Sequence, residues 1–192
     1  MERFSLNFGF SNFITVYSVD KNVQADGSER LNINSAEADL ENGLSDVLSS
    51  STIQSIRTSG PYLSAGYLLD VQGVTASSFK RIVDRVTVIP VPIPGQININ
   101  TAPRQVLLAL PGMEEEMVEA MIAYRSQEEV DLSNIGWVLD VSLDDEMKKQ
   151  QLKVMANQIT TRSYQFRIDS VGRIGDRLEE SSFTEEETPF AF

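Results

Sequence analysis

The sequence predicts an α+β protein that is mainly helical, with two tandem helix-hairpin modules linked by short strands and a small antiparallel sheet. The main observation is an internal repeat: a Leu/Ile-Asn-Ile-Asn-Ser/Thr-Ala motif occurs twice, at Leu31–Ala36 and Ile97–Ala102. A helical run follows each copy, and then a box of Gly, an aromatic residue, two aliphatic residues, Asp and Val, at Gly66–Val71 and Gly136–Val141. A repeat of this length indicates two related modules.

The first module is expected to span residues 13–85. Phe13–Tyr17 is rich in β-branched and aromatic residues, which predicts a strand. A polar loop follows over 20–30, and apolar residues at helical spacing then predict a helix over 36–48. These apolar residues are Leu40, Leu44, Val47 and Leu48.

The second module is expected to span residues 86–160 and repeats this order. Val86–Ile89 predicts its strand, which a proline-rich extended loop follows. A helix after the second motif ends at Pro111 and Gly112, and another is expected over 114–125. Two helices joined by a Pro-Gly turn make a helix-hairpin unit.

The repeated motifs connect strand to helix. Alternation places the aliphatic residues of each motif on one side and its asparagines on the other. The hydroxyl residue that follows is expected to be the N-cap of the next helix, because its oxygen can accept bonds from the free N–H groups of the first turn. The motif residues are Asn32, Asn34 and Ser35 in the first copy and Asn98, Asn100 and Thr101 in the second.

The boxes offer two candidate pairs of residues. Tyr67 and Trp137 stand beside aliphatic residues at helical spacing, which favours core packing over ligand stacking. Asp70 and Asp140 could be metal ligands, but an acid in this position more often caps the next turn.

The chain ends in a predicted strand and a tail. Tyr164–Val171 alternates strictly between apolar and polar residues, which predicts a β-strand with one solvated face in a closing region over 161–178. Residues 179–192 are acidic and polar and are expected to form a flexible tail. Residues 1–12 are expected to form an N-terminal strand or linker.

Charge and apolar runs limit the partners. The 192 residues carry a formal charge of −12, from 28 acidic and 16 basic residues. This field has the wrong sign for a protein that grips phosphate backbones or an anionic membrane surface. No apolar run approaches the length of about 18 residues that spans a bilayer.

The chemistry available to the chain is narrow. The sequence has no cysteine and no histidine, which excludes disulfides, thiolate nucleophiles and most general-base and transition-metal chemistry. The enzymatic alternative would use paired carboxylates such as Asp144 and Asp145. Adjacent residues on a helix point about 100° apart and are normally a solvated surface. We therefore expect no catalytic residues and no enzyme.

The segments Ile97–Pro103, Val106–Gly112 and Ala120–Arg125 together resemble two known groups. One is the helix-hairpin-helix DNA-binding modules, such as those of the competence DNA-receptor family. The other is the K-type minor pseudopilins of the bacterial type II secretion system, also called general secretion pathway protein K, whose helical insertion carries tandem SAM-like domains.

Two features favour the pseudopilin family. DNA-binding hairpins use Gly-rich turns whose amides receive a phosphate, whereas Met113–Glu116 places three carboxylates after this turn. At the corresponding turn, the first module has Ser49–Thr52 in place of the Pro-Gly pair. The pseudopilin pattern also covers about Phe13–Gly175, against Asn98–Arg125 for the DNA-binding modules. A nucleic-acid binder would be favoured if Arg81, Arg85, Arg104 and Arg125 lay on one face.

The resemblance implies a non-enzymatic structural subunit at the tip of the type II secretion pseudopilus. Its implied partners are the I- and J-type minor pseudopilins, contacted through a pilin-like strand region. The family has an N-terminal helix that anchors it in the inner membrane and leaves the rest in the periplasm. This sequence contains no such helix, and we expect it to belong to the full-length protein.

Calcium is implied only by the resemblance, because family members sometimes bind it in the pilin domain. The oxygen-rich loop from Asp20 to Glu29 could host such an ion. Its spacing matches no EF-hand, so the sequence assigns no metal ligands.

Overall fold

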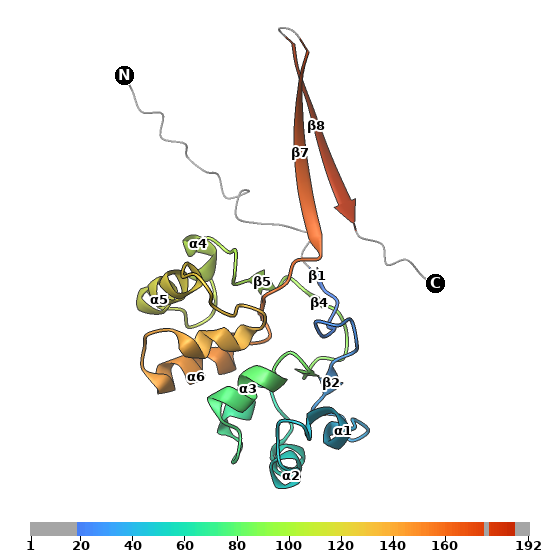
Figure 1. The fold of residues 1–192 in the computed structure, drawn as a ribbon, viewed down its shortest axis with the longest axis vertical. Helices are drawn as coiled ribbons and strands as arrows, with labels where there is room; N and C mark the ends of the chain where they lie inside the picture. Colours follow the sequence, from blue (N-terminus) through green and yellow to red (C-terminus); the bar gives the residue numbers. More distant parts are fainter. Residues whose placement is uncertain (1–18, 175–176, 187–192) are drawn as a thin grey trace.

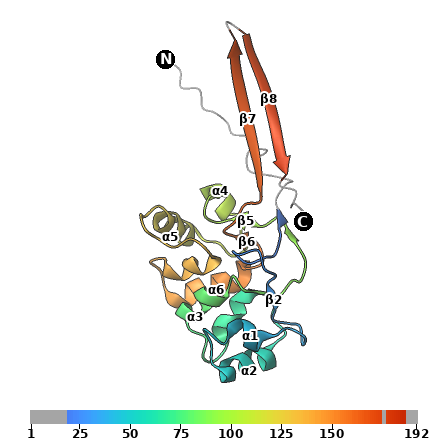
Figure 2. The same cartoon turned by 45° about the vertical axis from the view of Figure 1, so that its right-hand side comes forward.

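The computed structural model describes residues 19–174 and 177–186. The helices form one body, and a long hairpin of β7 (Gln165–Ile174) and β8 (Arg177–Glu186) projects from it (Figure 1). Figure 2 shows the same hairpin standing clear of the helices in a second view. The fold is therefore mixed, with a helical body and small two-stranded sheets, in agreement with the predicted α+β class.

The first half of the body closes on itself through a parallel strand pair. β3 returns beside β2 with Leu31 opposite Val86, and the N–H of Ile33 donates to the carbonyl of Thr87 at 2.9 Å. In chain order the elements are β2 (Leu31–Asn32), α1 (Leu40–Leu44), α2 (Ser50–Ser59), the 3₁₀ helix η2 (Ala65–Asp70), α3 (Ala76–Ile82) and β3 (Val86–Thr87).

The second half has the same order and the same closure. Ile97 of β5 lies opposite Ile159 of β6, and the N–H of Ile99 donates to the carbonyl of Thr160 at 2.9 Å. The elements are β5 (Ile97–Asn98), α4 (Arg104–Leu107), α5 (Glu115–Arg125), the 3₁₀ helix η3 (Ile135–Asp140), α6 (Asp145–Met155) and β6 (Ile159–Thr160).

The boundary between the halves differs from the predicted one. Val86–Thr87 had been expected to open the second half, but it pairs with β2 and so completes the first. An antiparallel pair, β1 (Val19–Asp20) with β4 (Ile93–Pro94), then joins the start of the described chain to the proline-rich connection. Val86 and Thr87, which the sequence places at the start of the second module, therefore pair with a strand of the first half.

Local capping explains where several helices begin. Ser49 accepts a bond from the third residue of α2, and Thr75 forms a reciprocal capping box with Ser78 in α3. Asp144 accepts from two backbone N–H groups of α6, whose first turn is acidic and so suits the positive end of the helix dipole. These short polar side chains set helix starts that the apolar pattern alone leaves open.

Ser35 and Thr101 are not the N-caps that the sequence predicted. The N–H of each donates to the carbonyl of the first asparagine of its motif, so the chain first makes a tight turn. The N-cap of α1 is Asp39 and that of α4 is Pro103, which has no side-chain capping bond. The turn delays both helices, and α1 covers five residues instead of the expected 36–48.

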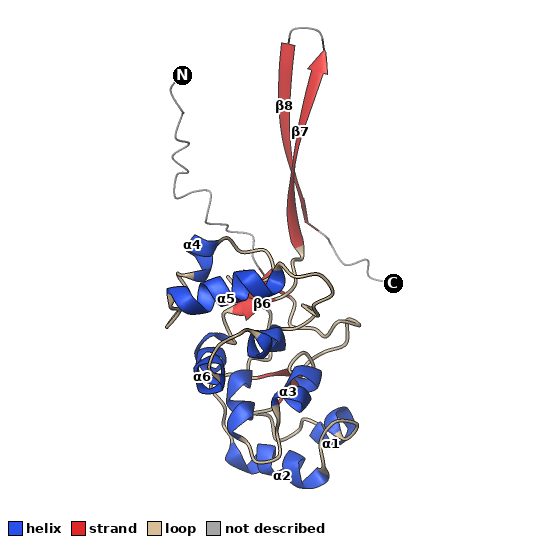
Figure 3. Ribbon diagram, turned by 60° about the vertical axis from the view of Figure 1, so that its left-hand side comes forward, coloured by secondary structure: helices blue, strands red, loops and turns tan. Residues whose placement is uncertain are grey.

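A single core runs through both halves. Phe79, Leu68 and Trp137 are among its fully buried side chains. η2 packs against α6 and η3 packs against α3, so each box contacts the closing helix of the other half. Figure 3 shows α3 and α6 in the middle of the body, with α4 and α5 on one side of them and α1 and α2 on the other.

The carboxyl end departs from the expected flexible tail. Residues 179–186 belong to β8, which pairs antiparallel with β7 over ten residue pairs, and β7 continues to Ile174 instead of ending near Val171. Composition identified the acidic character of this segment but could not show that a partner strand satisfies its backbone. The expected strand at Phe13–Tyr17, the linker over 1–12 and the last part of the tail, 187–192, lie outside the described residues.

Candidate functional site

The two Asn-x-Asn motifs make the same turn in both halves. The N–H of Asn34 donates to Asn32 Oδ1 at 3.0 Å, and the N–H of Asn100 donates to Asn98 Oδ1 at 3.0 Å. An asparagine side chain that accepts from the backbone two residues on mimics a backbone turn. The alternating motif therefore supplies one structural turn per half.

The second asparagine of each motif ties the start of its half to the segment before the box. Asn34 Nδ2 donates to the carbonyl of Tyr62 at 2.9 Å, and Asn100 Nδ2 donates to that of Leu132 at 3.0 Å. Asn100 Oδ1 also accepts from Trp137 Nε1 at 3.0 Å. Both asparagines thus hold the motif of their half to the segment that precedes its box.

The structure treats the two box aromatics differently. Trp137 is fully buried and stacks on Tyr124 with ring centroids 5.6 Å apart, as a core anchor should. Tyr67 is only half-buried at the edge of the core. The buried tyrosine of the first half is Tyr62, whose hydroxyl donates to the carbonyl of Ile56 at 2.9 Å. The core role predicted for Trp137 is confirmed, and Tyr67 only lies against the core.

The Pro111–Gly112 turn is closed by contacts within the second half. Gly112 has φ +69°, a left-handed conformation that favours glycine, and Gln151 of α6 donates to the carbonyl of Pro111 at 2.9 Å. Arg104 of α4 bonds Glu119 of α5 at 2.6 Å. The hairpin is therefore held by α6 at its turn and by an ion pair along its side.

Asp70 and Asp140 form ion pairs across the two halves. Asp70 Oδ1 lies 2.6 Å from Lys153 Nζ, and Asp140 Oδ1 lies 2.8 Å from Lys80 Nζ. Each lysine stands six residues before the closing strand of its half, so the pairs are equivalent under the repeat. The prediction that these acids cap the next turn is wrong, because a lysine of the other half engages each of them.

The box glycines allow the close approach that these ion pairs need. A Cβ on Gly66 would lie 2.6 Å from the carbonyl oxygen of Leu152 and 2.7 Å from Cα of Lys153. A Cβ on Gly136 would lie 2.7 Å from Cγ of Lys80. These distances are shorter than real Cβ contacts, so a Cβ on Gly66 has no room against the backbone of α6 and one on Gly136 would displace the side chain of Lys80.

A buried polar network joins the start of the described chain to both closing strands. Asp20 is almost fully buried and accepts from Thr160 at 2.9 Å, while Arg30 lies 3.4 Å from its other oxygen. Asp84 receives Arg30 at 3.1 Å and Arg162 at 2.5 Å. Burial is the largest single influence and opposes the charge of Arg162, but the hydrogen bond that Arg162 donates to Asp84 and the attraction of that carboxylate, with a smaller contribution from Tyr164, together raise the pKa of the guanidinium. Sequence reasoning missed this network, because its members come from distant segments that share no motif.

A small cavity of about 50 Å³ lies beside this network. Thr87 and Val86 line it from the first half, and Ile159 and Thr160 from the second. Sites for organic ligands are usually about 300–1,000 Å³, so this space suits water rather than a substrate.

The four arginines of the nucleic-acid alternative are engaged inside the body. Arg85 binds Asp46 at 2.7 Å, and Arg81 reaches the same carboxylate at 4.0 Å. Arg104 is paired with α5, and Arg125 donates to the carbonyls of residues 99 and 102, each at 2.7 Å. Each of the four therefore has an acceptor within the protein.

The paired carboxylates of the enzymatic alternative have structural partners. Asp144 caps α6, and Asp145 lies 2.8 Å from Lys148 one turn on. The hydrogen bond from Lys148 lowers the pKa of Asp145. The two acids therefore have separate roles rather than a common substrate.

The loop considered for calcium directs its carboxylates to protein donors. Asp20 faces Arg30 and Thr160, and Asp26 accepts from the backbone and hydroxyl of Ser28 at 2.9 and 2.6 Å. Within residues 19–174 and 177–186, no group of three acidic side chains is placed to hold a metal ion.

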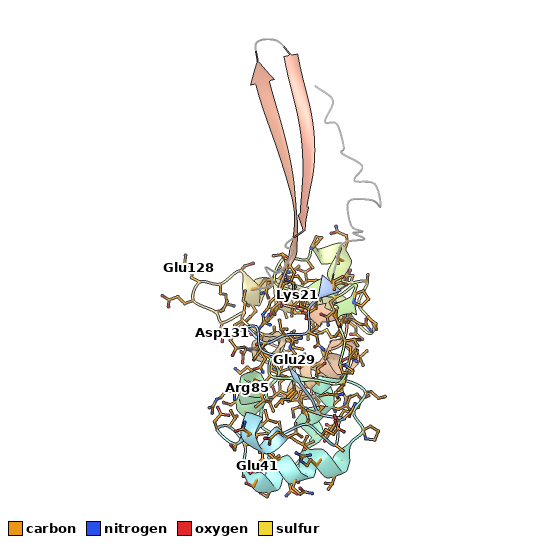
Figure 4. All side chains as sticks on the ribbon, turned by 90° about the vertical axis from the view of Figure 1, so that its right-hand side faces the viewer. Lys21, Glu29, Glu41, Arg85, Glu128 and Asp131 are labelled. Atoms are coloured by element: carbon orange, nitrogen blue, oxygen red, sulfur yellow. The ribbon has the colours of Figure 1, made fainter. Side chains whose placement is uncertain are left out.

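The hairpin of β7 and β8 is the longest of the two-stranded sheets in the described part of the chain. β7 and β8 pair with each other over ten residue pairs, and neither is paired with a further strand among the described residues. Lys21 Nζ lies 5.3 Å above the ring of Tyr164 at the base of this hairpin, where Figure 4 places Lys21. Open strand edges can pair with another chain, so we take β7 and β8 as the candidate interaction surface.

Within the described residues, no helix has the length and apolar character needed to cross a membrane. Comparisons of the chain with protein-family models, with curated proteins and with solved structures found no match.

Proposed function

We propose that this chain is the periplasmic part of a K-type minor pseudopilin, a non-enzymatic structural subunit of the type II secretion pseudopilus. The observation that carries the proposal is the architecture: a two-part helical body from which an antiparallel hairpin projects (Figure 1). The family resemblance in the sequence implies this combination of tandem SAM-like modules and a pilin-like strand region.

The contacts of the body support a structural role. The two box acids that the sequence singled out are tied to lysines of the body, Asp70 to Lys153 and Asp140 to Lys80. The cavity between the halves is small. The body is thus well suited to act as a rigid block, and the open edges of the hairpin are suited to assembly.

In the proposed role, the subunit joins the I- and J-type minor pseudopilins at the pseudopilus tip and starts its assembly. The wide helical body favours a tip position, because it would not fit inside a narrow filament. The family resemblance implies an anchoring helix in the inner membrane for the full-length protein. Exported substrates would pass beyond the tip, and the subunit itself would carry out no chemistry on them.

The test is assembly with the proposed partners. The chain is mixed with the soluble I- and J-type domains from the same genome, and the mass of any complex is measured by light scattering after size exclusion. Labelled single- and double-stranded DNA are added in parallel at low salt. We expect a stable ternary complex and no DNA shift.

Two other results would overturn the proposal. If the chain stays monomeric with both domains, the assignment to the tip complex is wrong. DNA binding that weakens steeply with salt would instead identify a nucleic-acid protein, because counterion release makes such binding salt-dependent.

A further inference from the structure

We infer that β8 binds a basic, extended segment of a partner protein as an added strand, an inference that deepens the proposed function and, for the identity of the partner, rests on it. The free edge of β8 would pair with the backbone of that segment, and lysine or arginine residues on it would meet the glutamates of β8. The partner is therefore recognised by two features, an extended backbone and positive charge.

The backbone argument starts from the length of the hairpin. Ten residue pairs join β7 and β8, and the pair stands clear of the helical body (Figures 1 and 2). An isolated two-stranded hairpin is marginally stable in water, and three or more strands are usual in stable sheets. A third strand would satisfy the open edge and stabilise the hairpin.

The charge argument comes from the register. β8 contains four glutamates and one arginine. The residues opposite Glu179 and Glu185 are Gly172 and Phe166, and the arginines of β7 lie opposite Thr184 and Leu178. Opposite charges on neighbouring strands stabilise a sheet.

Diagonal neighbours separate two of the glutamates from the others. The register puts Glu180 and Glu186 two residues from the positions opposite Arg173 and Arg167. Glu179 and Glu185 have no basic residue of β7 opposite or diagonal to them within the described hairpin. A basic partner strand would therefore gain the most electrostatic stabilisation at Glu179 and Glu185.

A second copy of this chain is a poorer occupant of the edge. Two copies of β8 side by side would bring like charges together, and the whole chain already carries a formal charge of −12. A basic strand from another protein avoids this repulsion.

The first arm of the experiment uses a defined probe. It is a fluorescent ten-residue peptide in which valine and lysine alternate, compared with the same peptide carrying glutamate for lysine and with an N-methylated version. N-methylation removes the N–H groups that a ladder requires. Binding to the full chain is measured by anisotropy. We expect the lysine peptide to bind at least about 10-fold more tightly than either comparison peptide.

The variant E179K/E185K tests the two positions, and E37K/E128K is the matched control. Both change the net charge equally, and Glu37 and Glu128 are exposed residues of the body, where Figure 4 shows Glu128 pointing outward. E179K/E185K should weaken binding of the lysine peptide at least about 10-fold, whereas E37K/E128K should leave it within about 2-fold. Equal losses in the two variants would show a general charge effect and overturn the inference.

The second arm repeats the comparison with the soluble I- and J-type domains. If the ternary complex forms and E179K/E185K weakens it, both proposals stand. If the complex forms equally with both variants, the inference fails and the proposed function survives. If no complex forms but the peptide binds as expected, the proposed function fails and the inference survives with another basic partner.

Two further results would identify a different occupant. A dimer of the chain that E179K/E185K dissociates would show that a second copy takes the edge. The variant I14D/V16D places charges in the strand expected at Phe13–Tyr17. If this variant binds the lysine peptide at least about 10-fold more tightly than the original chain, the N-terminal segment of the chain competes for the edge of β8. Either result would overturn the inference.

Discussion

The ammonium group of Lys153 lies 2.6 Å from the carboxylate of Asp70, and this contact crosses from the closing helix of one half to the box of the other. Lys80 and Asp140 make the equivalent contact in the opposite direction at 2.8 Å. The halves are therefore interlocked through a reciprocal pair of lysine–aspartate bridges.

The two bridges should differ in their effect on stability. The side chain of Lys153 is 7% exposed and that of Asp70 is 55% exposed, whereas those of Lys80 and Asp140 are each 34% exposed, so only the first bridge has a buried lysine. Asp70→Asn should lower the free energy of unfolding by about 2 kcal/mol, because it leaves a buried ammonium without its carboxylate. Asp140→Asn should cost less than about 1 kcal/mol.

Urea denaturation measures both changes in the interlock. A matched variant, Asp70→Asn with Lys153→Met, removes the buried charge and should regain at least half of the loss. Equal costs for Asp70→Asn and Asp140→Asn would contradict the difference in burial.

Substitution of the two box glycines by alanine should lower the stability of the protein by different amounts. Gly66→Ala places a Cβ against the backbone of α6, which cannot move locally, so we expect a loss of about 3 kcal/mol or more. Gly136→Ala meets the flexible side chain of Lys80 and should cost about 1–2 kcal/mol. Thermal unfolding ranks the two, and equal losses would contradict the difference between a backbone and a side-chain obstacle.

Loss of the Asn100 side chain should be detectable through the fluorescence of Trp137. Trp137 is the single tryptophan of the chain, and its indole N–H donates to Asn100 Oδ1. Asn100→Ala should destabilise the protein by about 2–3 kcal/mol and shift the emission, because it leaves a buried donor without its partner. Trp137→Phe in the same background should reveal a coupling near about 1 kcal/mol, and strict additivity would argue against this bond.

Asp84 should be the most sensitive member of the polar network. Asp84→Asn weakens two arginine contacts at once, so we expect a loss of about 3 kcal/mol in urea denaturation. Asp26→Asn is a suitable control, because that carboxylate serves a local turn with Ser28. The control should leave the unfolding midpoint unchanged, and a comparable loss there would place the cause outside the network.

Low pH should remove the contribution of the Asp131 carboxylate to the free energy of unfolding. Hydrogen bonds from the hydroxyl and the backbone N–H of Ser133 lower the pKa of Asp131 below its usual value of 3.8. Because the folded pKa is the lower one, the stabilisation is present above about pH 4 and disappears as pH falls through the folded pKa. Asp131→Ala should therefore be less stable than the original chain at pH 7, and the gap between their urea midpoints should narrow as pH falls below about 4. A gap that does not narrow in acid would assign the effect to something other than this ionisation.

Much of the local structure could be predicted from the sequence. The stripe of Leu40, Leu44 and Leu48 is buried, α5 begins and ends within a residue of the expected helix, and Gly112 adopts the left-handed turn. These features depend on periodicity and on residues with strong backbone preferences, which act over a few positions.

Other features depended on which segments meet. Ser35 was a sound N-cap by residue type, but the tight turn made with Asn32 moved the helix start to Leu40. Asp70 was read as a local cap because its partner, Lys153, lies far along the chain. Residues 179–186 were read as a tail because nothing in their composition reveals the strand opposite.

The sequence by itself determined that the Asn-x-Asn motif and the glycine box each occur twice with a helical run between them, because these signals are local and repeat. Only the tertiary structure decided how the halves combine. It interlocked the boxes with the opposite closing helices, paired β2 with β3 and β5 with β6, and brought Asp20, Arg30, Asp84 and Arg162 into one network. Contacts of this kind join residues far apart in the chain, so burial and geometry in the folded state select them rather than any local preference.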